Sequence, residues 1–300
     1  MNIAQGLDEH MMPITAENGV CLALNERIGI ETALDELKMQ IQSDEVLFWG
    51  KVLGVEKDYY IALALYYKNK EFPLKRFYFA LSDTFVFSEL PQIHKHHLRH
   101  FKKYNTYFIG NPDTILEKYV SSHHQQQQHQ QPLTSYEIEK AIASGKFIPQ
   151  NELKPLTECD RLSYVVRCID NDTSVIPVGA MKMIPSNELR RDDNFSGLNA
   201  DDVGDVRKYC HFRKAQKANK VELIEMGDAV FNSNFLDGLN EDKVQHCWSV
   251  HVDNAKTVCN IRSLVWPGYF AYHKTNTNMY GGCYIGYGYK VKDIAFMQQQ

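Results

Sequence analysis

The sequence lacks the features that would place it in several large classes of protein. No apolar run reaches the roughly 18 residues that a membrane-spanning helix requires. The net charge at pH 7 is only −4, whereas a nucleic-acid-binding protein usually carries a basic domain or stripe. The N-terminus has no basic stretch followed by an apolar run, so neither a signal peptide nor a transit peptide is indicated. These absences predict a soluble, intracellular protein that binds neither membranes nor nucleic acid.

Histidines cluster twice at spacings that can capture a transition metal, but the other ligands of a metal site are missing. The seven cysteines are an odd number, are scattered over the whole chain and form no CxxC pair, which is typical of reduced thiols that act as small core residues. Histidines gather at 94–100 and again at 123–129, but no Cys, Asp or Glu interleaves the first group, and the second lies in a glutamine tract. We therefore expect no metal site and no cofactor.

Sequence motifs of catalysis are also missing. There is no GxSxG, no HExxH and no dinucleotide-binding fingerprint. Gly281 and Gly286 have the spacing of a phosphate-binding loop, but Tyr287 stands where that motif requires lysine. Cys210 and His211 are adjacent, and neighbouring side chains diverge on a helix and on a strand alike. No catalytic residue is predicted, and a thiol or metal enzyme remains only as a minor alternative.

The composition is that of an ordinary globular domain with many aromatic residues. Hydrophobic residues make up 44% of the 300 residues and charged residues 23%, close to the averages of soluble domains. The chain is long enough to bury a sizeable core. Tyrosine and phenylalanine are abundant, at 17 and 15 residues, with 3 tryptophans. We expect a single domain over residues 1–300.

The order of patterns along the chain predicts an α+β fold made mainly of antiparallel strands. Apolar residues recur at a helical period over about 17–43, where Gly29 is expected to separate two short helices and Thr32 to cap the second. Three aromatic and aliphatic runs then follow at 46–55, 58–67 and 72–82, with short links typical of an antiparallel meander.

The second of these runs has two apolar faces. Tyr59, Ile61 and Leu63 alternate with Tyr60, Ala62 and Ala64. The first set is expected to face the core. The second set is expected to be half covered by a helix or by another subunit, and cover from within the chain is the simpler alternative.

The second half of the chain is expected to consist mostly of hairpins. The pattern predicts one hairpin that turns at Asn171–Thr173, a helix after Asn199, a hairpin across Asp253–Lys256, and a final strand pair across the polar turn 274–278. Between the two β-rich halves, residues 91–132 are rich in histidine and glutamine and contain little to bury. We expect them to form an exposed insert.

Four sequence blocks are distinctive. They are VLFWGKVLGVEKDYYIA (Val46–Ala62), VIPVGAMKM (Val175–Met183), NFSGLNADDVGDVRKYCHFRK (Asn194–Lys214) and IRSLVWPGYFAYHKTNTNMYGGCYIGYG (Ile261–Gly288). Together these blocks resemble the radial spoke head protein 9 family. The blocks stand in the order and spacing of the family. The related radial spoke head proteins 4 and 6 share similar elements but are much longer, so the length also favours protein 9. The insert at 91–132 has no counterpart in this resemblance.

The resemblance implies a non-catalytic structural subunit of the radial spoke head, located in the axoneme of motile cilia and flagella. Its implied role is to support contact between the spoke head and the central pair, and through it the mechanical regulation of dynein-driven beating. The implied partners are subunits of the radial spoke head protein 4/6 type, other head and neck subunits, and central-pair projections. A scaffold or interaction module of another axonemal complex is the alternative.

Aromatic residues and one arginine within these blocks are the candidates for interface or core positions. Tyr and Trp give large contact areas at a small cost in conformational entropy, and Arg forms well-directed ion pairs. For each aromatic residue an ordinary place in the core is an equally good expectation. The candidates are Trp49, Tyr59, Tyr60, Arg262, Trp266 and Tyr284.

Overall fold

The computed structural model describes residues 19, 21–68, 70–93, 101, 104, 106–117 and 155–294. Within these ranges the α-helices are α2 (Leu24–Gln40), α5 (Glu158–Thr173) and α6 (Ala218–Glu225). Three short 3₁₀ helices are η4 (Val206–Lys208), η5 (Asp228–Val230) and η6 (Leu239–Glu241). None of the helices in the described ranges is both long enough and apolar enough to cross a membrane.

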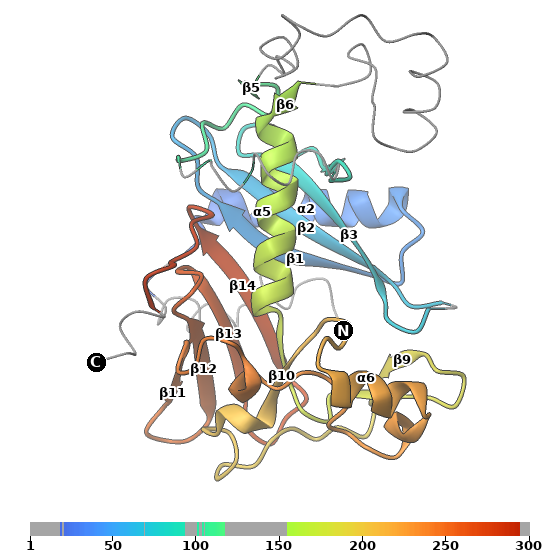
Figure 1. Ribbon diagram of the computed structural model, residues 1–300. Coiled ribbons are helices and arrows are strands. Elements are labelled where there is room, and N and C mark those ends of the chain that lie inside the picture. Colours follow the sequence, from blue (N-terminus) through green and yellow to red (C-terminus); the bar gives the residue numbers. More distant parts are fainter. Residues whose placement is uncertain are drawn as a thin grey trace, which may run out of the picture.

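One large sheet organises the described residues. Its eight strands are β1 (Glu45–Val52), β2 (Tyr59–Tyr66), β3 (Leu74–Leu81), β4 (Ser88–Glu89), β11 (Trp248–Val252), β12 (Val258–Ser263), β13 (Tyr269–Lys274) and β14 (Tyr280–Gly286). Their order is β11-β12-β13-β14-β1-β2-β3-β4, so the first and last parts of the chain meet at β1 and β14 (Figure 1). That contact is parallel, and the other neighbours in the sheet are antiparallel. The predicted α+β class with mainly antiparallel strands is confirmed.

Six short strands form three small sheets beside the large one. They are β5 (Ile115–Glu117) with β6 (Leu156–Thr157), β7 (Val175–Pro177) with β10 (Tyr209–His211), and β8 (Met181–Met183) with β9 (Leu189–Arg191). The last two pairs lie with α6 near the C-terminal end of α5 (Figure 1).

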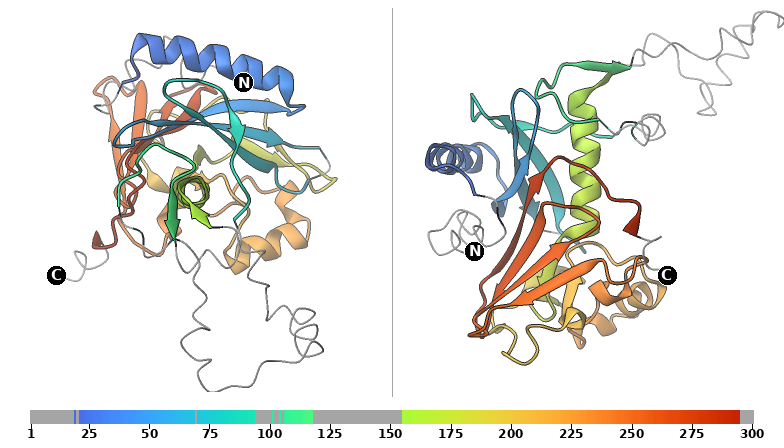
Figure 2. Two further views of the ribbon diagram at one scale, coloured as in Figure 1. Left: turned by 90° about the horizontal axis from the view of Figure 1, so that it is seen from above. Right: turned by 90° about the vertical axis from the view of Figure 1, so that its left-hand side faces the viewer.

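The large sheet is covered by a helix on each face, as the end-on views show (Figure 2). On one face α2 packs with Tyr60, Ala62 and Ala64 of β2 in one buried cluster. On the other face the larger cluster includes Tyr59, Ile61 and residues of α5. The alternation predicted for this strand is therefore confirmed, and its aromatic second face is covered by a helix of the same chain.

A single helix stands where two short ones were predicted near the N-terminus. Helix α2 runs through Gly29 without a break, and Thr32 donates its hydroxyl hydrogen bond to the Ile28 carbonyl instead of capping a helix. Close packing explains the glycine at position 29, because a Cβ there would lie 2.9 Å from the ring of Phe85. The glycine lets an aromatic ring approach the helix and does not end it.

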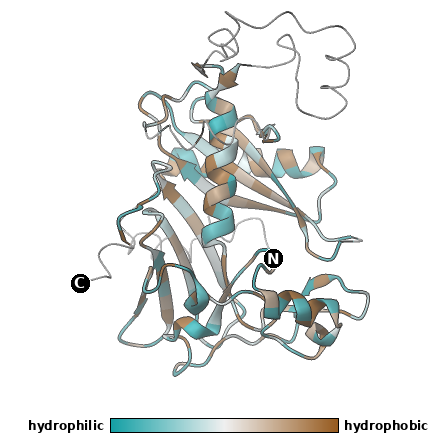
Figure 3. Cartoon of the chain, viewed as in Figure 1, coloured by the Kyte–Doolittle hydropathy of each residue, from teal (hydrophilic) through white to brown (hydrophobic). Residues whose placement is uncertain are grey.

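The predicted hairpin at Asn171–Thr173 is wrong, because residues 158–173 form α5. Thr157 begins the helix: its hydroxyl oxygen accepts from the Asp160 N–H, and the Asp160 carboxylate accepts from the Thr157 N–H. This reciprocal cap satisfies donors that a helix start leaves open. The β-branched pair Val165–Val166 gave the segment a strand-like local pattern, but its buried positions follow the helical period. Figure 3 shows hydrophobic and hydrophilic residues alternating along the visible side of α5.

The other predictions for the second half have mixed outcomes. The helix expected after Asn199 is wrong: turns lead to η4, where Asp205 caps the Arg207 N–H, and then directly to β10. The hairpin across Asp253–Lys256 is confirmed as β11–β12, and the final pair is confirmed as β13–β14.

Part of the predicted insert belongs to the folded core, which corrects its expected boundary. Residues 106–117 are described, and Phe108 within them is completely buried against the main cluster. The sequence pattern did not predict this, because the segment is positioned by the buried Phe108 ring and by the close approach of the Gly110 and Gly54 backbones to Lys57. The two histidine groups at 94–100 and 123–129 lie outside the described residues.

Strands β1 and β14 meet along only three residue pairs, from Gly50–Tyr284 to Val52–Gly286. At Gly50 the two backbones touch: a Cβ there would lie 2.1 Å from the Tyr284 carbonyl oxygen. A β-bulge next to Gly50, between Phe48 and Gly50, bends β1 at this point. The joint between the two halves of the sheet therefore depends on a glycine.

We predict that Gly50→Ala lowers the free energy of unfolding by about 2 kcal/mol or more, because the added methyl group collides with backbone atoms. Gly227→Ala is the matched control. Gly227 also has a positive φ, of 81°, but a Cβ there meets nothing within 4 Å. Chemical denaturation of both variants measures the difference, and equal losses would show that steric contact at the joint is unimportant.

Candidate functional site

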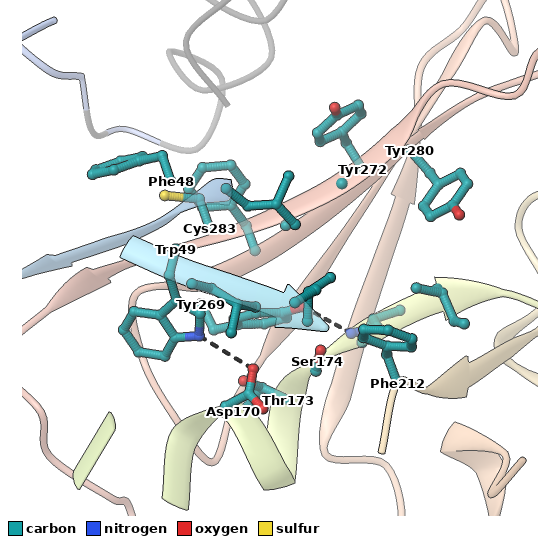
Figure 4. A pocket seen from close by; sticks show the side chains of 18 of the residues that line it. Phe48, Trp49, Asp170, Thr173, Ser174, Phe212, Tyr269, Tyr272, Tyr280 and Cys283 are labelled. Carbon is teal, nitrogen blue, oxygen red and sulfur yellow. Dashed lines mark hydrogen bonds between the residues drawn. The ribbon is translucent and has the colours of Figure 1, made fainter. Parts of the chain in front are cut away.

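A cavity of about 130 Å³ lies where β1 and β14 diverge. Beyond their three paired residues the two strands separate, and the gap is lined by Phe48 and Trp49 of β1 and by residues 280–283 of β14. The lining is mostly apolar and aromatic and comes from both faces of the sheet. The chain thus has an opening within its main sheet, with α5 at one side (Figure 4).

The polar lining of this cavity includes the buried Asp170 carboxylate, which is paired with the partly buried Lys75. The Asp170 carboxylate accepts from the Trp49 indole N–H at 3.3 Å and from the Lys75 ammonium at 2.6 Å, as the view of Trp49 and Asp170 illustrates (Figure 4). Lys75 also donates to the Phe212 carbonyl at 2.6 Å and lies over the Phe212 ring. Both charges are thereby paired and hydrogen-bonded, as buried charges must be. This network ties α5 to β1 and β3.

A second buried carboxylate holds the loop 106–111 at the opposite end of α5. Glu158 is completely buried, and its carboxylate accepts from the Tyr59 hydroxyl at 2.7 Å. It also accepts from three successive backbone N–H groups, those of Ile109, Gly110 and Asn111, at 2.9, 2.8 and 3.2 Å. Burial first, and then the hydrogen bond to Glu158, raise the pKa of Tyr59, so the phenol keeps the proton that it donates. We call this arrangement the Glu158 clasp.

Arg161, one turn further along α5, strengthens the same attachment. Its guanidinium donates to the Thr106 carbonyl and hydroxyl oxygens and lies over the Phe108 ring, 4.3 Å from the centroid. Contacts of this kind are stronger in a desolvated setting. The loop is therefore fixed by hydrogen bonds at its backbone, which leaves its side chains available to face outward.

The loop presents an exposed apolar surface that we call the tyrosine patch (Val55, Tyr107, Ile109 and Tyr287). The rings of Tyr107 and Tyr287 meet edge to face, with centroids 5.1 Å apart. The N–H groups of Val55 and Glu56 donate to the carbonyls of Phe108 and Ile109, which places these segments side by side. Val55 is 72% exposed, Tyr107 64% and Tyr287 53%. Contiguous exposed apolar residues of this kind are typical of protein interfaces.

Comparison with known proteins identifies the family. A sequence model of the radial spokehead-like protein family matches residues 7–166. The chain belongs to this family. It is 28% identical over 289 residues to a radial spoke head protein 9 homolog of Danio rerio, covering 96% of this chain and 97% of that relative. The radial spoke head protein 9 homologs of Homo sapiens and Mus musculus are 28% and 29% identical over 286 residues, with 95% of this chain and 96% of each relative covered. The predicted relationship to the radial spoke head protein 9 family is confirmed.

The five aromatic candidates are buried within the folded protein. They are Trp49, Tyr59, Tyr60, Trp266 and Tyr284. Trp49 and Tyr284 are in tilted ring contact beside the cavity, and Tyr59 belongs to the clasp. Tyr60 donates its hydroxyl hydrogen bond to Glu26 of α2, and Trp266 donates its indole N–H to Asp172 of α5. Their packing within the chain accounts for their burial, and an interface role stays a prediction.

Arg262, the candidate pairing charge, is exposed on β12. It lies opposite Phe270 of β13 and opposite Ser249 of β11 in the sheet register. Phe270 lines the same cavity as Trp49, but Arg262 is not itself among the lining residues.

Cys210 and His211, which suggested the alternative of a thiol or metal enzyme, have side chains with different partners. Cys210 and His211 point to opposite sides of β10: the Cys210 thiol lies against the Ile176 carbonyl, whereas His211 bonds to Asp242 at 2.9 Å. Burial raises the pKa of the Cys210 thiol to about 12, so the nucleophilic thiolate is disfavoured at neutral pH. Among the described residues, no group of three or more His, Cys, Asp or Glu side chains is placed to hold a metal ion.

Sequence reasoning missed the residues that build the tyrosine patch. Glu158 and Tyr107 were not among the candidates, since one lay at an unrecognised helix start and the other inside the supposed insert. The spacing of Thr157 and Asp160, which forms the helix cap, was the available signal for the first. No local sequence pattern predicts the contact between Tyr107 and Tyr287, which are 180 positions apart in the chain.

We predict that Glu158→Gln destabilises the chain by about 2 to 3 kcal/mol, because the amide turns an NH₂ group toward donors that now face a carboxylate. Tyr59→Phe, which removes one of the donors, should cost less. Glu56→Gln is the control, since Glu56 is exposed. Urea unfolding measures all three, and a Glu158→Gln variant as stable as the control would contradict the importance of the clasp.

We also predict strong coupling between Lys75 and Asp170. Either Lys75→Met or Asp170→Asn alone should cost about 3 kcal/mol by leaving an unpaired buried charge, and the double variant should lose less than the sum. The exposed pair Lys57–Asp83, at 2.5 Å, is the control and should show no measurable coupling. A double-mutant cycle that is additive at Lys75 and Asp170 would show that the pair does not act as a unit.

Proposed function

We propose that the chain is a non-catalytic structural subunit of the radial spoke head in motile cilia. In this role it supports contact between the head and the central pair, and so contributes to the mechanical regulation of dynein-driven beating. Family membership supports the spoke head, and the tyrosine patch is the observation in the molecule that carries the structural role. A packing subunit needs a rigid exposed surface, which the patch supplies.

The tyrosine patch is exposed, whereas the loop that carries part of it is held by buried groups. Tyr107 and Ile109 stand on a loop whose backbone is held by the fully buried Glu158. A surface held in this way loses little conformational entropy when a partner binds. Tyrosines add large amphipathic contact area and are enriched among residues that contribute most to binding.

The proposed partners are head subunits of the radial spoke head protein 4/6 type, together with other head and neck subunits. Central-pair projections are proposed as the contact beyond the head. The proposed location is the ciliary axoneme. These proposals are supported by the family and by a patch whose apolar residues favour a protein surface over a nucleic acid or a small polar ligand.

We further propose that the chain acts as one domain. The large sheet contains strands from both ends of the described chain. Helix α5 packs in the main cluster with residues from both halves of that sheet. A load applied at the tyrosine patch would then pass through the Glu158 clasp and α5 to the Asp170 network at the other end of the helix.

The experiment that tests the function compares axonemes with and without the protein by cryo-electron tomography, with swimming recorded in the same cultures. Loss of head density with intact stalks and abnormal beating is the expected result. Complete heads and normal beating in a verified null would contradict the proposal. Defects confined to another axonemal complex would instead favour the alternative of a scaffold outside the spoke.

For the patch itself, we predict that Tyr107→Asp with Tyr287→Asp prevents incorporation into the head in a rescue of the null strain, because the two charges must be desolvated at the interface. Stability should change little, since both residues are exposed. Phe231→Asp is the matched control, because Phe231 is 91% exposed on η5's C-terminal side, away from the patch. Normal incorporation of the double variant would place the interface elsewhere.

A further inference from the structure

Strand β11 is the outermost strand at one edge of the large sheet, on the left in Figure 1. On its inner side it pairs with β12 in antiparallel register, from Trp248–Ser263 to Val252–Cys259. Its outer side has no neighbouring strand within the ranges that the structure describes. An edge strand leaves a row of backbone donors and acceptors open, and such a row is a template for another strand. The sheet can therefore be extended at β11.

Two hydrogen bonds, one just beyond each end of β11, show which of its backbone groups point outward. The Leu264 N–H donates to the Cys247 carbonyl at 2.9 Å, and the Asp253 N–H donates to the Val258 carbonyl at 3.1 Å. In an antiparallel pair of strands, residue pairs that exchange hydrogen bonds alternate with pairs that do not. Both bonds lie on the same register as the rest of β11 and β12, and both give the same alternation.

Three residues of β11 direct their backbone groups away from the sheet. Counting in steps of two from either bond, the N–H and C=O groups of Ser249 and His251 face β12. Those of Trp248, Val250 and Val252 face outward. Among the described residues, no backbone group of another segment bonds to these three. The edge therefore offers a donor and an acceptor at each of three alternate residues.

This edge has neither the charges nor the bulge that usually protect a sheet against pairing with another chain. Its sequence, WSVHV, contains no proline, lysine, arginine or acidic residue, and its register with β12 is unbroken. The opposite edge is blunt and charged: β4 has two residues, both exposed, and its Glu89 lies 3.8 Å from Arg76. Of the two edges, β11 is thus the one suited to receive a strand.

The pattern of β11 is complementary to itself, which identifies the strand that fits it. Val250 is the middle one of the three outward-pointing residues. An antiparallel second copy centred there pairs Val250 with Val250 and Trp248 with Val252, and each of these pairs can exchange hydrogen bonds. A twofold axis through the central pair relates the two copies, so the contact closes on itself as a dimer.

The side chains suit the same register. Trp248, Val250 and Val252 pack against the main cluster and are only partly buried, so a second copy would extend their apolar surface. Trp248 opposite Val252 is an aromatic and β-branched pair, which stabilises adjacent strands. On the other face, Ser249 would lie opposite His251, so no two charges of like sign face each other across the new pair.

We propose that β11 joins two copies of the chain as an antiparallel strand pair centred on Val250. One sheet then runs through both copies. The inference goes beyond the proposed function, because the tyrosine patch has no part in this contact and a dimer can form outside the spoke head.

Val250→Pro in the full-length chain tests the proposal. Proline removes the outward N–H of residue 250 but no hydrogen bond to β12, so the fold should persist while strand pairing is blocked. We predict that sedimentation velocity over a concentration series shows a dimer of the unmodified chain, and that Val250→Pro weakens association by roughly tenfold or more. Val250→Thr is the matched control, since it keeps both the N–H and the β-branched shape, and it should associate like the unmodified chain.

A Val250→Pro variant that associates as strongly as Val250→Thr would overturn the proposal. An unmodified chain that stays monomeric over the whole concentration series would also overturn it.

Amide hydrogen exchange of the unmodified chain covers the case in which Val250→Pro fails to fold. Resolved to single residues, the amides of Trp248, Val250 and Val252 should exchange quickly in dilute solution and become protected as the concentration rises. Those of Ser249 and His251, which face β12, should be protected throughout and serve as the internal control.

Three exchange results would overturn the proposal. Protection of the outward amides in a monomer would mean that another segment of the same chain occupies the edge. Protection only in isolated spoke heads would assign the edge to a strand of a different protein. Rapid exchange under every condition would show that no strand pairs there.

Discussion

The Glu158 carboxylate is the constraint on which the rest of the structure depends. A buried charge with no partner would be too costly to retain, so the chain must bring donors to it. It does so with the Tyr59 hydroxyl and three backbone N–H groups of one loop. Meeting that requirement fixes the start of α5 against β2 and gives the loop at 106–111 one conformation. Tyr107 of the patch therefore stands on a loop whose backbone is fixed by hydrogen bonds.

The aromatic residues of the chain fall into a buried group and an exposed group. The buried aromatics Trp49 and Trp266 give their indole N–H groups to Asp170 and Asp172 near the end of α5, and so fasten that helix across the joint of the sheet. The exposed Tyr107 and Tyr287 make few demands on the fold. This division is consistent with the proposed structural role, because residues of the exposed patch can change without disturbing the buried core.

Much of the fold could be predicted from local patterns, and much of the site could not. Alternation at period two located β1 to β3 and the two C-terminal hairpins, since each of those strands buries at least one face. Helix α5 was misread because Val165–Val166 is strand-like over a short window, whereas the deciding cap at Thr157 lies eight residues earlier. The clasp and the patch join residues far apart in the chain, and no spacing rule reports such pairs. The family resemblance supplied the functional context that the physical pattern alone did not.

The most direct test of this account is a single-particle cryo-electron microscopy map of isolated radial spoke heads that contain the protein. We predict that side chains of a neighbouring head subunit pack directly on Tyr107 and Tyr287, with the loop 106–111 in the conformation that its hydrogen bonds to Glu158 impose. A map in which both tyrosines face solvent while the chain contacts its neighbours through another surface would contradict it.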